Sequence, residues 1–425
     1  MEKIFDKETP KAVLISVRLK DEDERECEAS LGELERLLDT AGGELCAEVV
    51  QVRESPDPRT YIGTGKLTEV RDICESAGAS LVIFDGELSP AQIRNAEDAI
   101  GGDVRVIDRP MLILDIFALH AVTGEGKLQV ELAQLKYTIP RLAGHGTEMS
   151  RLGGGIGTRG PGESKLESDR RHVKRRIAAL EEQIDELEKN RRTKREKRDK
   201  SGIFRVAIAG YTNAGKSTLL NRLTDAGILA EDKLFATLDP TTRKFTLPCG
   251  TDILLTDTVG FIRNLPTQLI KAFRSTLEEV VYCDAILIVV DASDPEYQAQ
   301  TEVTEKLISE LGASDKPVIY AYNKCDKREE GFTPPPGSRD RLGVCVSAVT
   351  GQGTEKLIEL LEITANGGKQ TVTFRIPADK GAALSYLYAN ASVKSADYEG
   401  TDAVVTATVD KKTLGVVNKM LGEAQ

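Results

Sequence analysis

The sequence of 425 residues has no tryptophan, and no apolar run in it approaches the length of a membrane span. Its longest uninterrupted apolar stretch runs from Ala285 to Val290, whereas a spanning helix needs about 20 residues. The first ten residues, MEKIFDKETP, lack the apolar segment of a secretory signal peptide. From these absences we expect a cytoplasmic protein without a membrane span.

Cysteines that could pair or hold a metal are also lacking. The seven cysteines are scattered, with no C-x-x-C pair and no histidine cluster beside them. Their spacing predicts neither disulfides nor a zinc site. It is typical of cysteines that serve as small apolar residues in a protein of a reducing compartment. They are Cys27, Cys46, Cys74, Cys249, Cys283, Cys325 and Cys345.

Basic residues are in the minority. The chain carries 57 Lys and Arg against 68 Asp and Glu, a formal net charge of −11. This balance argues against general binding to nucleic acid, which needs a basic excess to neutralise phosphates. Any contact with nucleic acid must therefore come from a local basic region.

The length predicts two to four domains. Between residues 11 and 110, short β-rich runs such as 11–19 and 44–52 alternate with amphipathic segments that have apolar residues three or four apart. Strands that alternate with helices of this length indicate a parallel α/β unit.

Two apolar stripes with steps of four and three follow. Each stripe alone is typical of an ordinary core-facing helix, but two of them on either side of one loop favour a long antiparallel hairpin. We expect Pro140 to bend or end the first helix near its tip. The stripes are Leu128, Leu132, Leu135, Ile139 and Leu142, and Val173, Ile177, Leu180, Ile184 and Leu187.

The loop between the stripes, residues 144–165, contains eight glycines and one proline, which predicts neither helix nor buried strand. It carries Arg151, Arg159 and Lys165. Taken alone, it could be a disordered hinge. Residues 189–200 hold eight basic residues against two acidic ones and read as a connector with a basic face.

The next segment is a glycine-rich loop between a strand and a helical pattern. A strand leads into Gly210-Tyr211-Thr212-Asn213-Ala214-Gly215-Lys216-Ser217, and a helical pattern follows. This is the G-x-x-x-x-G-K-S loop in its proper context: backbone N–H groups surround the β-phosphate at a helix N-terminus. Lys216 would bridge the β- and γ-phosphates, and the Ser217 hydroxyl would ligate Mg²⁺.

Three further motifs follow in the order of a G domain. Asp257-Thr258-Val259-Gly260 ends a strand, so Asp257 can hold a Mg²⁺-bound water and the Gly260 amide can contact the γ-phosphate. Asn323-Lys324-Cys325-Asp326 selects guanine, because the Asp326 carboxylate accepts hydrogens from N1 and N2 that adenine lacks. Ser347-Ala348 matches the last guanine-contacting loop. The motifs together predict a GTPase with its ligand at the crevice of a doubly wound sheet.

Three details of this site concern mechanism. Phe261 stands where many GTPases have the glutamine that orients water, so we expect slow turnover without a partner. Asn213 could hold a potassium ion beside the phosphates, or it could be a turn residue. The threonine that closes over Mg²⁺ could be Thr237, Thr241 or Thr242 from their spacing alone.

Four stretches of this chain together resemble the HflX family of translation-associated GTPases over nearly its whole length. They are YIGTGK (61–66), SRLGGGIGTRGPGESKLESDRR (150–171), the loop GYTNAGKST and FATLDPTTR (235–243). The resemblance implies that the glycine-rich loop is a hairpin tip that reaches ribosomal RNA, and that Thr237 ligates Mg²⁺. It also implies a GTPase that binds the large ribosomal subunit and splits stalled or idle ribosomes. Relatives often have Thr-Gln where this chain has Ser164-Lys165.

The residues expected to act fall into three groups. We predict Lys216, Thr237 and Gly260 as catalytic, and Ser217, Thr237 and, through water, Asp257 as the Mg²⁺ site. The RNA-contacting residues are Arg151, Gly153, Gly154, Gly155, Arg159 and Lys165. The GTP-binding residues are Gly210, Tyr211, Thr212, Asn213, Ala214, Gly215, Lys216, Ser217, Thr218, Phe235, Ala236, Thr237, Leu238, Asp239, Asp257, Thr258, Val259, Gly260, Asn323, Lys324, Cys325, Asp326, Ser347 and Ala348.

The sequence thus predicts a multidomain α/β protein of four parts. These are an N-terminal α/β domain (1–110), an antiparallel helical hairpin with a glycine-rich tip (111–200), a P-loop G domain (201–365) and a small C-terminal α+β domain (366–425). We expect a monomer whose partners are GTP, GDP and the large ribosomal subunit with its RNA. Alternatives are a regulatory switch that acts through protein partners, a ribosome-assembly GTPase, or an enzyme with its own ATP site at residues 63–66.

Overall fold

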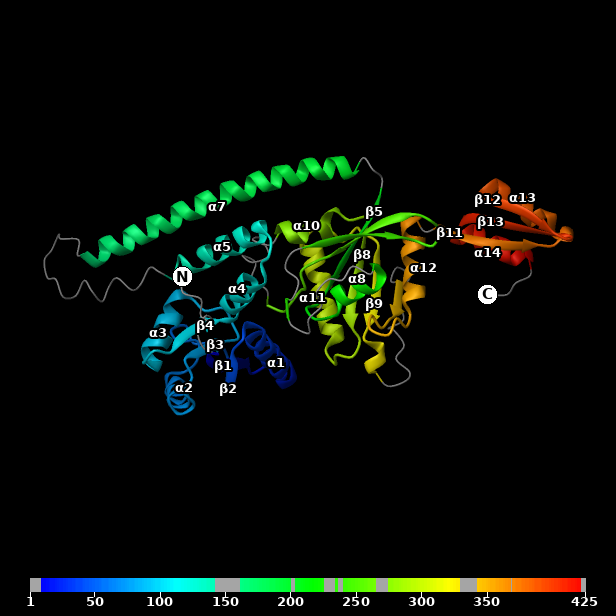
Figure 1. Ribbon diagram of the computed structural model, residues 1–425. Helices are drawn as coiled ribbons and strands as arrows, with labels where there is room; N and C mark the ends of the chain where they lie inside the picture. Colours follow the sequence, from blue (N-terminus) through cyan, green and yellow to red (C-terminus); the bar gives the residue numbers. More distant parts are fainter. Residues whose placement is uncertain are drawn as a thin grey trace.

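The computed structural model describes residues 9–141, 161–199, 203–224, 234–235, 240–264, 274–328, 342–367 and 369–421. Four units follow one another along the chain (Figure 1). The predicted multidomain α/β fold is therefore confirmed. Within the described ranges, no helix combines the length and apolar character needed to cross a membrane.

The N-terminal unit is a parallel sheet with strand order β2-β1-β3-β4 and a hydrophobic cluster on each face. Local signals set its helix ends: the Asp23 side chain caps the start of α1, and Gly42 ends it in the left-handed conformation with a φ of 84°. The strands are β1 (Lys11–Leu19), β2 (Glu44–Arg53), β3 (Leu81–Phe84) and β4 (Arg105–Asp108). The helices are α1 (Glu24–Ala41), α2 (Thr64–Ala77), α3 (Pro90–Ile100) and α4 (Arg109–His120).

Helix α4 begins at Arg109, so the predicted boundary at residue 110 falls inside a helix. Its apolar residues, including Ile113, Ile116 and Phe117, belong to the same buried cluster as the inner face of α1. The cluster places this helix with the N-terminal sheet.

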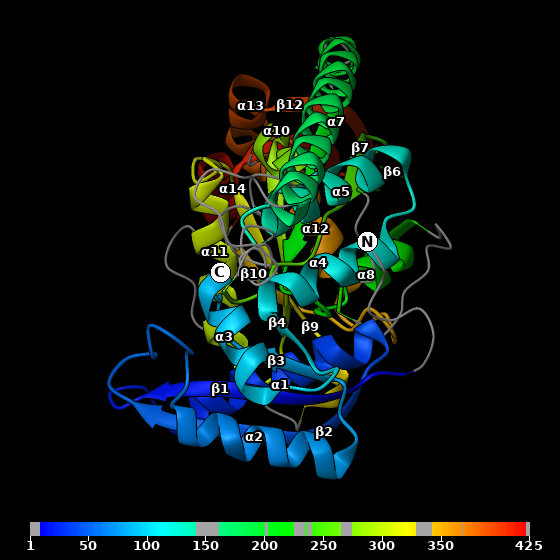
Figure 2. The same cartoon turned by 90° about the vertical axis from the view of Figure 1, so that its left-hand side faces the viewer.

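The next unit is a hairpin of α5 (Gly124–Thr138) and α7 (Pro161–Asp199), and α7 runs back over α5 (Figures 1 and 2). Helix α5 ends just before Pro140. Leu132 and Leu180 of the predicted stripes are buried, while Val130, Ala133 and Tyr137 of α5 join the core of the N-terminal unit. The short helix α5 is therefore held on two faces.

The prediction that residues 144–165 exclude helix is wrong at its C-terminal end. Helix α7 begins at Pro161 and includes Lys165. A proline is tolerated in the first helical turn, because its missing N–H would have no intrahelical acceptor there. Helix α7 then continues without interruption through the described part of the basic run 189–200.

The G domain is built on a sheet of order β10-β9-β8-β5-β7-β6, in which β6 alone runs antiparallel to its neighbour. Separate apolar clusters cover its two faces. The strands are β5 (Phe204–Gly210), β6 (Thr241–Thr246), β7 (Asp252–Asp257), β8 (Ala285–Asp291), β9 (Val318–Asn323) and β10 (Leu342–Cys345). The helices are α8 (Lys216–Thr224), α10 (Arg274–Tyr282), α11 (Tyr297–Glu310), η1 (Cys325–Lys327) and α12 (Thr354–Ala365).

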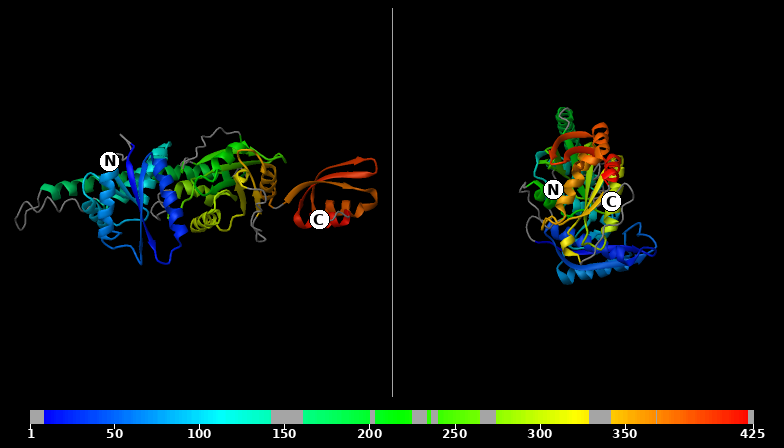
Figure 3. Two further views of the ribbon diagram at one scale, coloured as in Figure 1. Left: turned by 90° about the horizontal axis from the view of Figure 1, so that it is seen from below. Right: turned by 90° about the vertical axis from the view of Figure 1, so that its right-hand side faces the viewer.

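The C-terminal unit lies on the side of the G domain opposite to the N-terminal unit (Figure 3). Its antiparallel sheet has the order β11-β13-β12, and its helices pack on that sheet around one small core. The elements are β11 (Lys369–Ile376), η2 (Ala378–Lys380), α13 (Gly381–Asn390), β12 (Ser392–Glu399), β13 (Asp402–Asp410) and α14 (Lys411–Leu421).

Candidate guanine-nucleotide site

The phosphate-binding loop lies between β5 and α8, where the G-x-x-x-x-G-K-S motif predicts it. Gly210 and Gly215 have φ angles of 149° and 89°, which side chains rarely tolerate. A Cβ atom on Gly210 would collide with the carbonyl oxygen of Val289, and one on Gly215 with the amide of Asn323. The loop can therefore follow this path only with glycine at both positions.

Lys216 is buried at the start of α8, and its Nζ donates to the carbonyl oxygen of Tyr211 at 2.9 Å. Burial lowers the pKa of Lys216 to about 8, while the negative charge of Asp257 opposes the shift. Phosphate oxygens placed at this ammonium would favour its charged form.

Asp257 and Ser217 form the candidate magnesium site. Asp257 ends β7 fully buried, and its Oδ2 accepts a hydrogen bond from the Ser217 hydroxyl at 2.5 Å. Its Oδ1 has no hydrogen-bond partner among the described residues. Burial raises the pKa of Asp257, opposed by Lys216 and by the Ser217 hydrogen bond. A buried carboxylate oxygen left free beside a serine hydroxyl fits a Mg²⁺ ion with its bound water.

The segment after Gly260 lies against the phosphate-binding loop. The Phe261 amide donates to the Gly210 carbonyl at 3.0 Å, and the Phe261 carbonyl accepts from the Thr212 amide at 2.7 Å. The Phe261 side chain is buried in the core, on one face of the sheet. A Cβ atom on Gly260 would lie 2.7 Å from Cα of Thr212. Backbone groups, not the Phe261 side chain, therefore face the nucleotide side of this segment.

Asn323 joins the loops predicted to hold the base. Its Nδ2 donates to the Ala214 carbonyl, and its Oδ1 accepts from the Ala348 amide, both at 2.9 Å. Lys324 adopts a φ of 62° and pairs with Asp291 at 2.8 Å. Asp326 is exposed in η1. The structure thus brings residues 323–326 and 347–348 to one edge of the sheet, beside the phosphate-binding loop.

Sequence reasoning missed Asp291, which ends β8 and holds Lys324. The sequence does carry a signal for it, because Asp291 directly follows the apolar run 285–290. In a doubly wound sheet, the residue at the carboxyl end of a strand beside the phosphate-binding strand faces the ligand crevice.

Other predicted residues lie elsewhere or outside the described part of the chain. Phe235 is buried, but residues 236–239, with Thr237, are outside the described ranges. So are Arg151, Gly153, Gly154, Gly155 and Arg159 of the hairpin tip. Thr218 lies in α8, and Asn213 adopts a φ of 61° in the phosphate-binding loop. The side chain of Tyr211 faces the N-terminal unit, where its hydroxyl donates to Glu33 at 2.6 Å.

Four family models match successive parts of the chain. The GTP-binding GTPase N-terminal model matches residues 28–118, and the GTP-binding GTPase middle-region model matches residues 120–198. The model described as 50S ribosome-binding GTPase matches residues 205–324, and the HflX C-terminal domain matches residues 338–425. The four matches follow the order of the four structural units.

Whole-chain relatives agree with these matches. A GTPase HflX of Lacrimispora saccharolytica is 54% identical over 349 residues, which is 82% of each chain. A GTPase HflX of Caldanaerobacter subterraneus is 48% identical over 94% of this chain and 91% of its own. The GTPase HflX of Escherichia coli K12 is 41% identical over 89% of this chain and 88% of its own. The chain belongs to the HflX family of GTPases and is a GTP hydrolase.

Proposed function

We propose that this GTPase binds the large ribosomal subunit through its helical hairpin, and that GTP binding and hydrolysis drive the splitting or remodelling of ribosomes. The observation that carries the proposal is the hairpin itself. Helix α7 has 39 residues, about 58 Å at 1.5 Å per residue, and it extends past α5 on the side of the tip (Figure 1). The description of the family model over residues 205–324 names the 50S subunit, which supports the same partner.

The end of α5 that leads into the tip is fastened to the N-terminal unit. Asp108, fully buried at the start of α4, accepts hydrogen bonds from the Tyr137 hydroxyl at 2.6 Å and from Arg141 at 3.0 Å. The Arg141 guanidinium also stacks on the Tyr137 ring, 3.6 Å from its centroid. Arg141 is the last described residue before the tip segment, so the described end of α5 is tied to the N-terminal unit.

Net charge is compatible with such a partner. A chain with a net charge of −11 cannot bind RNA through its whole surface, but a glycine-rich tip leaves backbone N–H groups open to phosphates and bases. Arg151, Arg159 and Lys165 would supply the positive charge. The tip suits irregular, unstacked RNA better than a regular duplex.

We further propose that the residues predicted from the motifs hold the nucleotide. Ser217 and Thr237 would ligate Mg²⁺, and the free Oδ1 of Asp257 would hold one of its waters. When bound, Mg²⁺ neutralises charge that develops between the β- and γ-phosphates. Lys216 would hold the same phosphates, Asp326 would accept from guanine, and Asn213 would place a potassium ion. The GTPase would act in the cytoplasm.

Sedimentation through a sucrose gradient tests the proposal. With a non-hydrolysable GTP analogue, the protein should migrate with large subunits, and intact ribosomes should separate into subunits. The Lys216→Ala variant, which loses the phosphate contact, is the matched control and should do neither. A wild-type protein that stays at the top of the gradient with the analogue would reject the ribosomal partner.

A further inference from the structure

The three segments that surround the γ-phosphate position in GTPases also contact the N-terminal unit. Tyr211 of the phosphate-binding loop, Phe235, and Val259 and Ile262 on either side of Gly260 share one buried apolar cluster with α1 and α4. The Phe235 ring packs edge-on against Phe117 of α4, with ring centroids 4.7 Å apart. The N-terminal unit thus packs directly against segments of the candidate nucleotide site.

A buried pair of hydrogen bonds crosses this contact. The Tyr211 hydroxyl donates to Oε1 of Glu33 at 2.6 Å and accepts from the Arg263 amide at 2.8 Å. Tyr211 is 5% exposed and Glu33 is 3% exposed. Burial and the negative charge of Glu33 raise the pKa of Tyr211, so the hydroxyl keeps its proton and can donate. The Tyr211 side chain therefore links the N-terminal unit to the backbone that follows Gly260, and Arg263 adds a longer contact, with its Nε 3.9 Å from Oε2 of Glu33.

Glu33 is itself fixed. Its Oε2 lies 2.7 Å from Nη2 of Arg109, a side chain that is 1% exposed. The other terminal nitrogen of Arg109 lies 2.7 Å from Asp85. A carboxylate buried in this way needs such partners, because burying an unpaired charge is costly. Glu33 is therefore a rigid acceptor rather than a side chain free to follow the loop.

We infer that Glu33 and Tyr211 are positioning residues for GTP hydrolysis, because together they set the place of the backbone from Gly260 to Arg263. That backbone is held at one end by the pairing of Phe261 with residues 210 and 212, and at the other by the Tyr211 hydroxyl. The Phe261 side chain is buried, so it does not orient the attacking water. We assign the orientation of water to backbone groups of this segment, and these two attachments help to fix where those groups lie.

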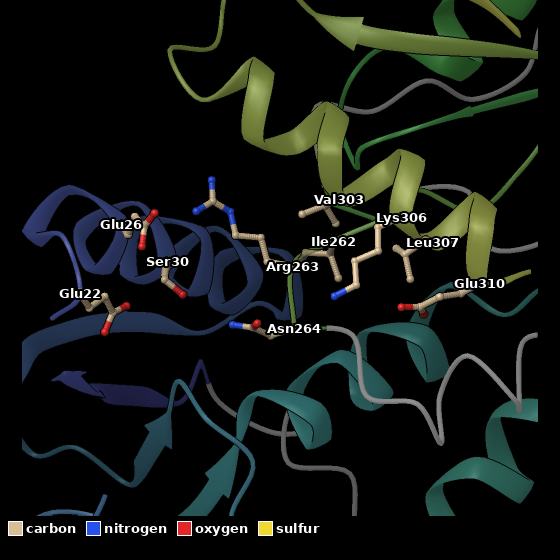
Figure 4. A pocket seen from close by; sticks show the side chains of 10 residues that line it. All are labelled: Glu22, Glu26, Ser30, Ile262, Arg263, Asn264, Val303, Lys306, Leu307 and Glu310. Atoms are coloured by element: carbon tan, nitrogen blue, oxygen red, sulfur yellow. The ribbon is translucent and has the colours of Figure 1, made fainter. Parts of the chain in front are cut away.

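Open space lies beside the second attachment. A cleft of about 520 Å³ separates α1 from α11, and Ile262, Arg263 and Asn264 line it between the two helices (Figure 4). Asn264 has a φ of 52°, an uncommon conformation for a side-chain-bearing residue. Without the Tyr211 hydroxyl, the segment has room to move toward this cleft. Ile262 is buried in the shared cluster, and the Arg263 side chain pairs with Glu296 at 3.3 Å, so the Tyr211 hydroxyl acts together with these contacts on a segment that is open only toward the cleft.

The Tyr211→Phe variant tests the inference, because it keeps the ring in the buried cluster and removes only the hydroxyl. We expect kcat for GTP hydrolysis by the free protein to fall about tenfold, with KM for GTP unchanged within about twofold, since misplacing a reacting group lowers the rate of chemistry more than binding. The matched control is Glu35→Gln on the exposed side of α1, which should retain wild-type kcat.

The pairing of the two residues has a second signature. If Glu33 acts through the Tyr211 hydroxyl, the effects of Glu33→Gln and Tyr211→Phe on kcat should not multiply. The double variant should then hydrolyse GTP no more than about twofold slower than the slower single variant. An unchanged or increased kcat in Tyr211→Phe, a rise in KM alone, or multiplied effects in the double variant would overturn the inference. Should Glu33→Gln fail to fold, the kcat and KM of Tyr211→Phe decide alone.

Discussion

Asn323 shows how single residues build the candidate site. Because its amide bonds both Ala214 and Ala348, it fixes the spacing between the phosphate-binding loop and the two loops predicted to hold the base. Asp326, three residues later, is exposed at the surface of η1. An exposed carboxylate on a fixed loop can accept hydrogen bonds from a base without paying for burial beforehand.

The first prediction concerns base selection by Asp326. Asp326→Asn should lower GTP affinity by about 100-fold, since two hydrogen bonds to a charged acceptor are worth about 3 kcal/mol. The same change should raise affinity for xanthosine triphosphate, because the amide can donate to the xanthine 2-oxygen. Competition against a fluorescent guanine nucleotide measures both. Asp315→Asn, on an exposed turn, is the control. Wild-type GTP affinity in Asp326→Asn would show that another group reads the base.

The second prediction concerns protons. The pKa of Lys216 is lowered to about 8 in the free protein, and bound phosphates should raise it. The ammonium is therefore present below pH 8, and GTP affinity should fall as pH rises through 8. At pH 8, binding should take up about half a proton per site. Calorimetry in two buffers of different ionisation enthalpy measures this uptake. Equal binding enthalpies in both buffers would contradict the assignment.

At the residue scale, the motifs named the loop at 210–217 and the loops at 323–326 and 347–348, which the structure brings to one edge of the sheet. They could not locate Glu33, which is 178 residues from Tyr211 in the sequence. A motif is readable when its residues lie on one strand and the turn after it. A carboxylate that reaches the site from another domain leaves no local pattern, and only the packing of the two units reveals it.

At the scale of helices and strands, the two apolar stripes predicted the hairpin. They did not predict the residues at which its helices begin and end. The stripes explain where α5 and α7 pack together. The start of α7 at Pro161 depends on a proline that is compatible with a first helical turn, although glycines surround it. Strand β12 is hard to predict from the sequence, because Ser392–Glu399 has few apolar residues and pairs only at the sheet edge.

The third prediction concerns the tip of this hairpin. Arg151→Ala with Arg159→Ala should weaken binding to large subunits about tenfold or more, and each lost phosphate contact should reduce the salt dependence by about one unit of slope. GTP affinity in the free protein should stay unchanged, because α7 separates the tip from the phosphate-binding loop. Filter binding at several salt concentrations measures the effect.

The control for the tip removes the same charge from another surface. Arg71→Ala with Arg94→Ala changes α2 and α3 and should leave subunit binding close to wild type. Chemical footprinting of the subunit RNA adds a direct comparison. If the tip variant protects the same nucleotides as wild type, the hairpin tip does not contact RNA. The alternative interpretation of residues 144–165 as a hinge would then be favoured.

On the scale of the molecule, two neighbouring residues join the hairpin to the nucleotide site. Asp108 holds Tyr137 and Arg141 at the base of the tip, and Arg109 holds Glu33, which binds Tyr211. Both residues lie where β4 meets α4, inside the N-terminal unit. Side-chain contacts on these two adjacent residues therefore tie both the tip end of α5 and the phosphate-binding loop to the same corner of the N-terminal unit.

The last prediction follows from this connection and from Phe261. Because the Phe261 side chain is buried and cannot orient water, GTP turnover should be slow in the free protein and should rise strongly with large ribosomal subunits. A complete catalytic partner raises such rates by about 10³ to 10⁵, and we expect a smaller rise here, because the subunit would act by ordering groups already present. Phosphate release with and without purified subunits measures it. The tip variant Arg151→Ala with Arg159→Ala should need more subunits to reach the same maximal rate, since it weakens binding and leaves the site intact. A turnover indifferent to subunits would contradict both the ribosomal partner and a catalytic role for subunit binding.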